Sequence, residues 1–297
     1  MNKLILAGSA GMLGSDIYRS LHQSNECFVG DIDRSDDHVL HLDFRNGEEY
    51  RAFAREINPD VLLHIGAHTD LEYCETNVTD CYQTNTSSVE HAVGIANQLK
   101  IKLVYISTAG IFDGKLEFYN DYDTPNPLGN YAKSKFYGER HIELHCNDYL
   151  IVRAGWMMGG GLQKDKKFIG KIMRQINSGS RTLNIVNDKL GTPTYTRDFA
   201  NNLKHLISED AIGKFNMVCG GLTSRMEVAQ FVCDYLGKHA GIRVNINEVD
   251  STFFKNEYFS PRPDNERLVN RRLIDLNLNL MRDWQSALYD YLGELVK

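Results

Sequence analysis

The first half of the chain alternates short apolar runs with stretches in which apolar residues recur every three or four positions. A buried run of four or five residues is typical of a strand in a parallel sheet, and the wider spacing is typical of an amphipathic helix. The pattern predicts strands at residues 3–7, 27–30, 61–65, 103–107 and 149–153. It predicts helices at residues 12–22, 47–57, 85–99 and 131–146. Strands that alternate with helices in this way form a parallel sheet covered on both faces.

The pattern changes after the glycine triplet at residues 159–161. It then predicts helices at residues 168–176, 196–207, 225–235 and 284–295, and strands at residues 183–186, 215–218 and 244–249. We expect the strand at 215–218 to return to the main sheet, and Thr196 to cap the helix that it opens. This organisation predicts one α/β domain at residues 1–167 and 194–220, and a smaller, discontinuous domain at residues 168–193 and 221–297.

The composition excludes several classes of partner. Lys and Arg total 33 and Asp and Glu total 39, so the formal net charge of the 297 residues is −6. A nucleic-acid-binding surface usually shows a clustered basic surplus, so we expect no nucleic acid partner. We expect no membrane association, because no run of about 18 apolar residues is present. Six scattered cysteines, with no Cys-x-x-Cys pair and no zinc spacing, favour reduced thiols in a cytoplasmic protein and predict no metal site.

A glycine-rich turn, GSAGMLG at residues 8–14, links the first predicted strand to the first predicted helix. Glycine permits a tight turn there and lets a diphosphate group approach the backbone N–H groups. The N-terminus of the helix adds a favourable dipole. The turn therefore predicts a dinucleotide site formed by Gly8, Gly11, Met12, Leu13 and Gly14.

Two carboxylates lie at the end of the second predicted strand. Asp31 and Asp33 can accept hydrogen bonds from the two hydroxyl groups of an adenosine ribose, which suits NAD, and we expect Asp33 to make this contact. Arg34 follows directly, and a guanidinium can instead hold the additional phosphate of NADP. The sequence therefore leaves both NADPH and NADH open as the cofactor.

The candidate catalytic residues lie on and beside a later helix. Tyr131 and Lys135 are four residues apart, so that their side chains share one helix face. A phenol ordinarily has a pKa of about 10, and we expect the nearby ammonium to lower the pKa of Tyr131. Tyr131 can then give its proton to a ketone oxygen while hydride reaches the carbon, with Lys135 also holding the nicotinamide ribose. Ser107 and Thr108 end the fourth predicted strand, and the Thr108 hydroxyl can steady the same oxygen.

Further motifs extend along almost the whole chain: NPDV at 58–61, FDG at 112–114, NPL at 126–128, VRAGW at 152–156, GTPTYTRD at 191–198 and RP-x-N at 262–265. Together with the glycine turn and the Tyr131–Lys135 pair, they resemble the extended short-chain dehydrogenase/reductase superfamily, and within it the dTDP-4-dehydrorhamnose reductase family. The resemblance implies a doubly wound, Rossmann-like, NAD(P)-binding parallel sheet with a smaller α/β substrate-binding domain.

The same resemblance implies roles for individual residues. Thr108, Tyr131 and Lys135 are the implied catalytic residues. The implied cofactor-lining positions are Asp43, Phe44, Gly66, Ala67, Thr69, Asn85 and Ser107. Those facing a nucleotide sugar are Thr108, Trp156, Thr192 and Arg262. The implied activity is NAD(P)H-dependent reduction of the 4-keto group of a nucleotide-linked 6-deoxy sugar, and a homodimer is left open.

Two other functions stay open at this point. A nucleotide-sugar epimerase uses the same three catalytic residues with tightly held NAD, and relatives of this group include a non-catalytic regulatory partner of methionine adenosyltransferase. A 4,6-dehydratase is disfavoured. Such enzymes follow the active-site threonine with an Asp-Glu pair, whereas Ala109 and Gly110 follow Thr108 here.

Overall fold

The main sheet has seven strands within the residues that the structure, a computed structural model, describes, which are 1–34 and 36–296. The strands are β1 (Lys3–Ala7), β2 (Glu26–Asp31), β3 (Val39–His41), β4 (Val61–His64), β5 (Lys102–Thr108), β6 (Tyr149–Ala154) and β11 (Gly213–Asn216). Their order is β11-β6-β5-β4-β1-β2-β3, and every neighbouring pair is parallel. The predicted parallel sheet is confirmed. Strand β11 returns to it, two residues earlier than expected, and the short edge strand β3 was not predicted.

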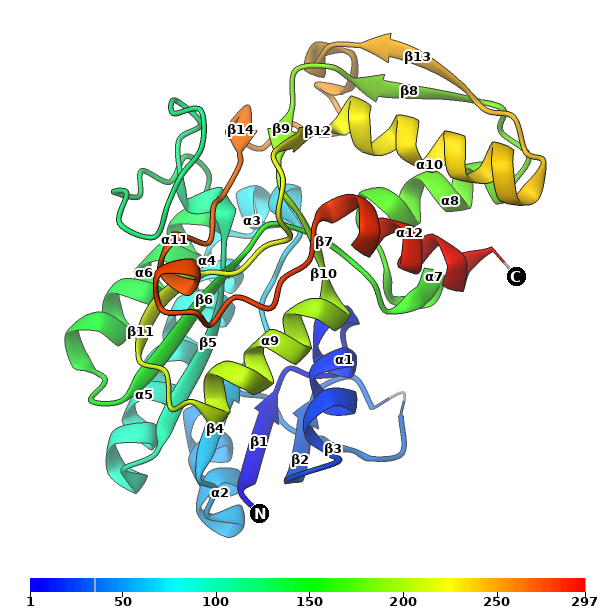
Figure 1. Cartoon of the computed structure of the whole chain (residues 1–297). Helices are drawn as coiled ribbons and strands as arrows, with labels where there is room; N and C mark the ends of the chain where they lie inside the picture. Colours follow the sequence, from blue (N-terminus) through cyan, green and yellow to red (C-terminus); the bar gives the residue numbers. More distant parts are fainter. Residues whose placement is uncertain (35, 297) are drawn as a thin grey trace.

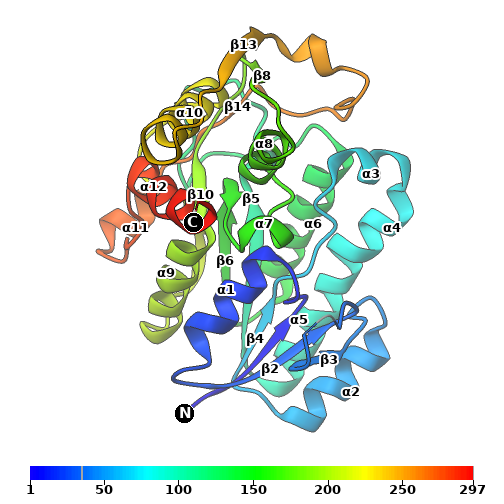
Figure 2. The ribbon, with the colours of Figure 1, turned by 90° about the vertical axis from the view of Figure 1, so that its right-hand side faces the viewer.

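Helices cover both faces of this sheet (Figure 2). Side chains along each strand alternate between two cores, one beneath each layer of helices. On β1, Leu4 and Leu6 pack toward α1 (Met12–Leu21) and α9 (Thr196–Ser208). Ile5 and Ala7 pack on the opposite face, toward α2 (Gly47–Ile57), α5 (Ser88–Leu99) and α6 (Asn130–His145). Both faces of the strand are apolar for this reason, as the continuous apolar runs predict.

A cap of α8, β8, α10 and β13 lies beyond the carboxyl ends of the main strands (Figure 1). The cap elements are α8 (Phe168–Asn177), β8 (Thr182–Val186), α10 (Arg225–Ala240) and β13 (Asn245–Val249), with β8 and β13 paired in parallel. Apolar side chains of the cap continue the core of the α1/α9 face, and α12 (Trp284–Leu295) closes it. The predicted strands and helices of this region are therefore present, although α10 extends five residues beyond the predicted end at 235.

Short elements connect the sheet to the cap. Strand β7 pairs with β10, and β9 lies between β12 and β14. Their bounds are β7 (Trp156–Met158), β9 (Leu190–Gly191), β10 (Pro193–Tyr195), β12 (Thr223–Ser224) and β14 (Asn265–Glu266). The other short helices are α3 (Leu71–Thr76), α4 (Val78–Tyr82), η2 (Ala109–Ile111), α7 (Gly161–Lys164), η3 (Ser251–Phe254) and α11 (Arg271–Asp275). The predicted domain limits stay a prediction. Helix α11, which belongs to the predicted smaller domain, contacts β11 of the main sheet.

Two local expectations were wrong. The helix expected at 85–99 begins with a π-helical turn, η1 (Gln83–Ser87), before α5, and such turns are frequent at functional sites. Thr196 does not cap α9, because Tyr195 occupies the cap position. The Thr196 hydroxyl is buried and donates instead to Asp16 Oδ2 at 2.5 Å, which joins α9 to α1. This partner lies 180 residues away in the sequence, so no local pattern reveals it.

Candidate active site

The glycine-rich turn lies between β1 and α1, at the carboxyl edge of the main sheet. Gly8 has a φ of +82°, and a Cβ atom there would lie 2.1 Å from Gly66 Cα. A Cβ atom on Gly14 would lie 2.4 Å from Ser9 Cα, whereas one on Gly11 would have no atom within 4 Å. Backbone packing therefore requires Gly8 and Gly14. Gly11 instead leaves open space at the N-terminus of α1, where the first N–H groups have no acceptor within the helix.

The carboxylate of Asp31 holds this turn in place. Its Oδ2 accepts a hydrogen bond from Ala10 N at 2.9 Å, and its Oδ1 accepts one from Asp33 N at 3.0 Å. Asp33 and Arg34 follow β2 and are exposed. Asp31 thus connects the two loops that begin at the ends of β1 and β2, and the expected ribose contact of Asp33 stays a prediction.

The segment after β4 is held between Phe44 and the catalytic helix. A Cβ atom on Gly66 would lie 2.4 Å from the Phe44 ring, so the ring packs directly on this glycine. Asn85 is buried in the π-helical turn and clasps His68, since its Oδ1 accepts from His68 N at 2.8 Å and its Nδ2 donates to His68 O at 3.0 Å. The same amide donates to Ser134 Oγ on α6 at 3.1 Å. The buried amide therefore fixes the loop relative to α6.

Three further predicted cofactor residues lie around this loop. Ala67 is partly exposed, and Thr69 accepts hydrogen bonds from Lys167 Nζ at its Oγ1 (3.0 Å) and its carbonyl oxygen (3.1 Å). Asp43 accepts a hydrogen bond from Arg45 Nε at 2.9 Å, and this bond lowers the pKa of the Asp43 carboxyl. The structure thus brings the predicted residues together, and their contacts with a cofactor stay predictions.

The three candidate catalytic residues converge at the end of β5 and the first two turns of α6. Thr108 Oγ1 accepts a hydrogen bond from Gly110 N at 3.1 Å, and the Thr108 side chain lies close enough to Tyr131 to act on the pKa of its phenol. Lys135 is 3% exposed, and its ammonium lies 4.1 Å from the centre of the Tyr105 ring. The phenol of Tyr131, the hydroxyl of Thr108 and the amine of Lys135 therefore lie together at the carboxyl edge of the main sheet, where the protein partly encloses them.

The expected effect of Lys135 on Tyr131 was wrong. Burial raises the pKa of Tyr131 above its ordinary value, and the nearby Thr108 side chain offsets this only in part. Burial also lowers the pKa of Lys135, to about 7. Desolvation disfavours the charged form of each group, and it is the largest cause of both shifts. Tyr131 is therefore a neutral phenol at neutral pH and retains the proton that a ketone oxygen would need.

The stability of the wild-type protein relative to Lys135→Met is expected to rise between about pH 7 and pH 10. The pKa of Lys135 is about 7 in the folded protein and ordinarily 10.5, so the unfolded chain binds more protons across this window. Below it the ammonium is charged in both states, and the cost of burying it is present in full. Urea denaturation of both proteins should show a relative gain of a few kcal/mol. If the difference in unfolding free energy between the two proteins did not vary with pH, the lowered pKa of Lys135 would be contradicted.

Ser107 contributes a hydroxyl without a partner. Its side chain is buried, and its Oγ has no hydrogen bond among the described residues. A buried hydroxyl in this state costs free energy unless a bound molecule satisfies it. Ser107 therefore marks a polar position beside Thr108 that a ligand at the sheet edge can use.

Trp156 lies at the centre of a stacked group that the sequence indicated only in part. Its Nε1 donates to Glu266 Oε2 at 2.7 Å, and the Arg225 guanidinium lies 3.7 Å from the centre of its ring. The same guanidinium lies 4.3 Å from the centre of the Phe168 ring. Sequence reasoning missed both Glu266 and Arg225. The one available signal was the position of Glu266 next to the RP-x-N motif at 262–265.

Other cations lie close to Arg225. Arg262 forms an ion pair with Glu72, and its guanidinium lies 5.3 Å from the centre of the Tyr258 ring. Lys171 donates a hydrogen bond to the Tyr258 hydroxyl at 2.8 Å. Burial lowers the pKa of Arg225 to about 10; the negative charge of Glu266 opposes this shift, and the positive charge of Arg262 adds to it. These positive charges suit an anionic group.

The surroundings of Thr192 differ from those expected of a residue that faces a sugar. It is fully buried, and its Oγ1 accepts a hydrogen bond from Leu268 N at 3.0 Å. Its carbonyl oxygen accepts from Trp156 N at 2.9 Å. Thr192 thus supports Trp156 through the backbone, and its hydroxyl is already engaged within the protein.

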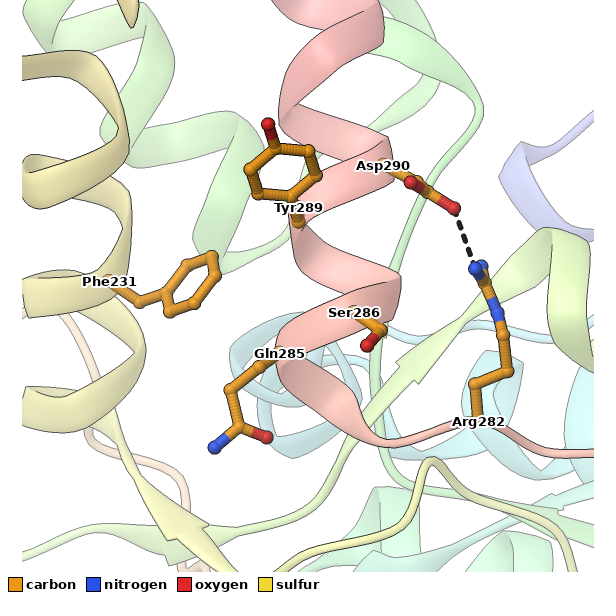
Figure 3. Close-up of a pocket in the computed structure, with 6 residues that line it drawn as sticks. All are labelled: Phe231, Arg282, Gln285, Ser286, Tyr289 and Asp290. Atoms are coloured by element: carbon orange, nitrogen blue, oxygen red, sulfur yellow. Dashed lines mark hydrogen bonds and ion pairs between the residues drawn. The ribbon is translucent and has the colours of Figure 1, made fainter. Parts of the chain in front are cut away.

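A shallow hollow between α10 and α12 is separate from this site (Figure 3). Phe231 and Tyr289 line it, and none of the predicted site residues does. Arg282 at its rim pairs with Asp290 at 2.6 Å and with Asp198 at 2.9 Å. Because these charges are satisfied within the protein, the hollow provides no comparable group of reactive side chains.

Across residues 1–34 and 36–296, no group of three or more His, Cys, Asp or Glu side chains is placed to hold a metal ion. In the same residues, no helix has both the length and the apolar character needed to cross a membrane. All six cysteines carry free thiols.

The parallel sheet, the glycine turn and the Thr108, Tyr131 and Lys135 side chains define an NAD(P)-binding, Rossmann-like protein of the short-chain dehydrogenase/reductase class. A family model described as the RmlD substrate binding domain matches residues 1–297. The chain therefore belongs to this family.

Individual relatives agree with this family over almost their whole length. The chain is 29% identical over 303 residues to a dTDP-4-dehydrorhamnose reductase of Salmonella typhimurium, which covers 98% of this chain and 97% of the relative. A solved dTDP-4-dehydrorhamnose reductase of Yersinia enterocolitica is 30% identical with a TM-score of 0.88, covering 99% of both chains. A reductase of the same name from Bacillus anthracis, solved in complex with NADP, has a TM-score of 0.87 at 24% identity and covers 99% of both chains.

Proposed function

We propose that this chain catalyses NAD(P)H-dependent reduction of the 4-keto group of a nucleotide-linked 6-deoxy sugar, as a dTDP-4-dehydrorhamnose reductase does. The observation that carries the proposal is the placement of Thr108 beside the neutral phenol of Tyr131, with Lys135 one helical turn further along α6. Relatives of that name match the chain from end to end.

The nicotinamide cofactor would supply a hydride to the sugar C4 when bound. Tyr131 would donate its proton to the ketone oxygen, so that the product is an alcohol and the phenolate is reprotonated from solvent. The Thr108 hydroxyl would donate a hydrogen bond to the same oxygen and limit the build-up of negative charge there. Lys135, one helical turn beyond Tyr131, would hold the cofactor ribose.

The glycine turn and the end of β5 fit a dinucleotide. The open space at Gly11 allows a diphosphate to reach the N–H groups of Met12 and Leu13 at the start of α1. The unpaired hydroxyl of Ser107 lies at the same sheet edge. These features support NADPH or NADH as the cofactor, and the choice between them depends on the exposed residues Asp33 and Arg34.

Replacing Gly11 with valine is expected to weaken NADPH and NADH binding at least about 10-fold without unfolding the protein. The backbone at Gly11, with φ −71° and ψ −179°, is accessible to any residue, and a Cβ atom there meets no protein atom within 4 Å. The added side chain would therefore occupy only the space assigned to the diphosphate. Fluorescence titration with each reduced cofactor measures the effect. Gly94→Ala, in α5 and equally unobstructed, is the matched control and should bind normally.

The stacked group around Trp156 supports a nucleotide-sugar substrate. Arg225 is held between two aromatic rings, and none of its guanidinium N–H groups has a hydrogen-bond acceptor among the described residues. A guanidinium in this state is suited to a diphosphate, which it can bind through two parallel hydrogen bonds. We therefore assign Arg225, together with Arg262, to the diphosphate of the substrate.

The proposal is tested by turnover. The purified protein is incubated with dTDP-4-dehydrorhamnose and either NADPH or NADH, and the absorbance of the reduced cofactor is followed with mass spectrometry of the sugar. We expect stoichiometric cofactor oxidation and a product heavier by two hydrogens. Interconversion of sugars without net oxidation would show an epimerase instead. No turnover, with stable binding to another enzyme, would favour a regulatory subunit. A cytoplasmic location and a homodimer stay predictions beside this proposal.

A further inference from the structure

Glu266 places a carboxylate at the catalytic edge from a distant part of the sequence. It ends β14, which pairs with β9 beside Trp156. Its Oε2 accepts the indole N–H of Trp156 at 2.7 Å, which fixes the orientation of the carboxylate. The second oxygen, Oε1, has no hydrogen bond within residues 1–34 and 36–296. One oxygen of this carboxylate is therefore hydrogen-bonded within the protein, and the other oxygen is available to a ligand.

The available oxygen points toward the reaction site. Glu266 Oε1 and Thr108 Oγ1 lie 3.4 Å and 3.5 Å from one point, the position that a Cβ atom on Gly110 would take. The charge of Glu266 also acts on Tyr131 and contributes to its raised pKa, after the larger effect of burial. Glu266 therefore flanks the two hydroxyls that would hold the ketone oxygen. The glycine at position 110 provides the room for it.

The chemistry of this oxygen limits what it can recognise. An ionised carboxylate only accepts hydrogen bonds, so its partner must be a donor. The negative charge of Glu266 already acts on the Arg225 guanidinium, so a second cation is not needed to balance it. A neutral hydroxyl satisfies the oxygen without adding charge. Sugar carbons next to the ketone carry such hydroxyls.

We propose that Glu266 is a specificity-determining residue, which accepts a hydrogen bond from the sugar hydroxyl on the carbon next to the ketone. This inference rests on the proposed function. A sugar without that hydroxyl leaves the carboxylate oxygen desolvated and unpaired, and an enzyme site built in this way rejects the deoxy analogue.

The test compares two substrates in three proteins. Wild type, Glu266→Ala and Glu266→Gln are assayed with dTDP-4-dehydrorhamnose and with its 3-deoxy analogue, and kcat/KM is measured for each pair. We expect wild type to prefer the hydroxylated sugar by about 10- to 100-fold, as hydrogen bonds to charged groups provide. The preference should fall to about twofold or less in Glu266→Ala and be intermediate in Glu266→Gln, which keeps an acceptor for Trp156.

The comparison separates recognition from support of Trp156. If Glu266 only positions the indole, Glu266→Ala slows both substrates by the same factor and leaves the preference unchanged, which overturns the inference. Wild-type protein that reduces both sugars equally overturns it while leaving the proposed function intact. Wild-type protein that reduces neither sugar overturns both. If the enzyme preferred a 3-amino analogue to the hydroxylated sugar, the hydrogen-bond partner of Glu266 would be a cation and not a neutral hydroxyl. Glu248→Gln, on exposed β13, is the control and should keep the wild-type preference.

Discussion

Replacing Tyr131 with phenylalanine is expected to lower kcat for ketone reduction by about 100- to 10,000-fold. Only the hydroxyl group is lost, and this group provides the proton that the ketone oxygen needs. Burial keeps the phenol protonated at neutral pH, so the wild-type donor is ready before substrate binds. Cofactor binding should change little, because Lys135 and the glycine turn are untouched.

The measurement is steady-state turnover with the nucleotide sugar, beside fluorescence titration with the reduced cofactor. Tyr137→Phe is the matched control, since Tyr137 lies on the same helix and is 49% exposed. It should retain wild-type kcat. Normal turnover in Tyr131→Phe would exclude Tyr131 as the proton donor and with it the proposed mechanism.

Replacing Arg153 with methionine is expected to lower the free energy of unfolding by about 3–5 kcal/mol. Arg153 on β6 forms two hydrogen bonds with Glu139 on α6, at 3.0 Å and 2.7 Å, and both side chains are 1% exposed. The substitution leaves the Glu139 carboxylate buried without its cation. Helix α6 also carries Tyr131 and Lys135, so this pair anchors the catalytic helix to the sheet.

Urea denaturation of the variants measures this effect. Arg140→Met removes a more exposed pair with Glu143 on the same helix, and it should cost about 0–1 kcal/mol. The double variant Arg153→Met/Glu139→Leu removes both charges and should recover much of the loss, because the Glu139 carboxylate is then not left buried without its cation. An Arg153→Met variant as stable as Arg140→Met would show that the buried pair does not hold α6.

Much of the fold could be predicted because its determinants are local. The apolar runs at β1 and β5 mark strands buried on both faces, and helices α2 and α12 match their predicted bounds. Edge strand β3 is three residues long, which is too short to show a periodic pattern. The π-helical turn before α5 was missed for a related reason, since its five residues make only about one turn and cannot show a period of their own.

The candidate site likewise combines features that the local sequence predicts with features that depend on the rest of the fold. Tyr131 and Lys135 share a face because four residues complete about one helical turn, and the glycines at 8, 11 and 14 follow a strand directly. Neither relation requires knowledge of the rest of the chain. The sequence alone therefore determined the parallel sheet, the position of the glycine turn after its first strand, and the shared helix face of the candidate catalytic residues Tyr131 and Lys135.

Only the tertiary structure decided how these side chains behave and what surrounds them. The direction of the Tyr131 pKa shift depends on burial, which is a property of the packed protein and opposes the effect expected from Lys135 alone. Glu266 reaches Trp156 across 110 residues of sequence, and Arg225 stacks on the same ring from a third segment. Hydrogen bonds and ring contacts act over a few ångströms, so residues so far apart in the chain interact only after the chain has folded.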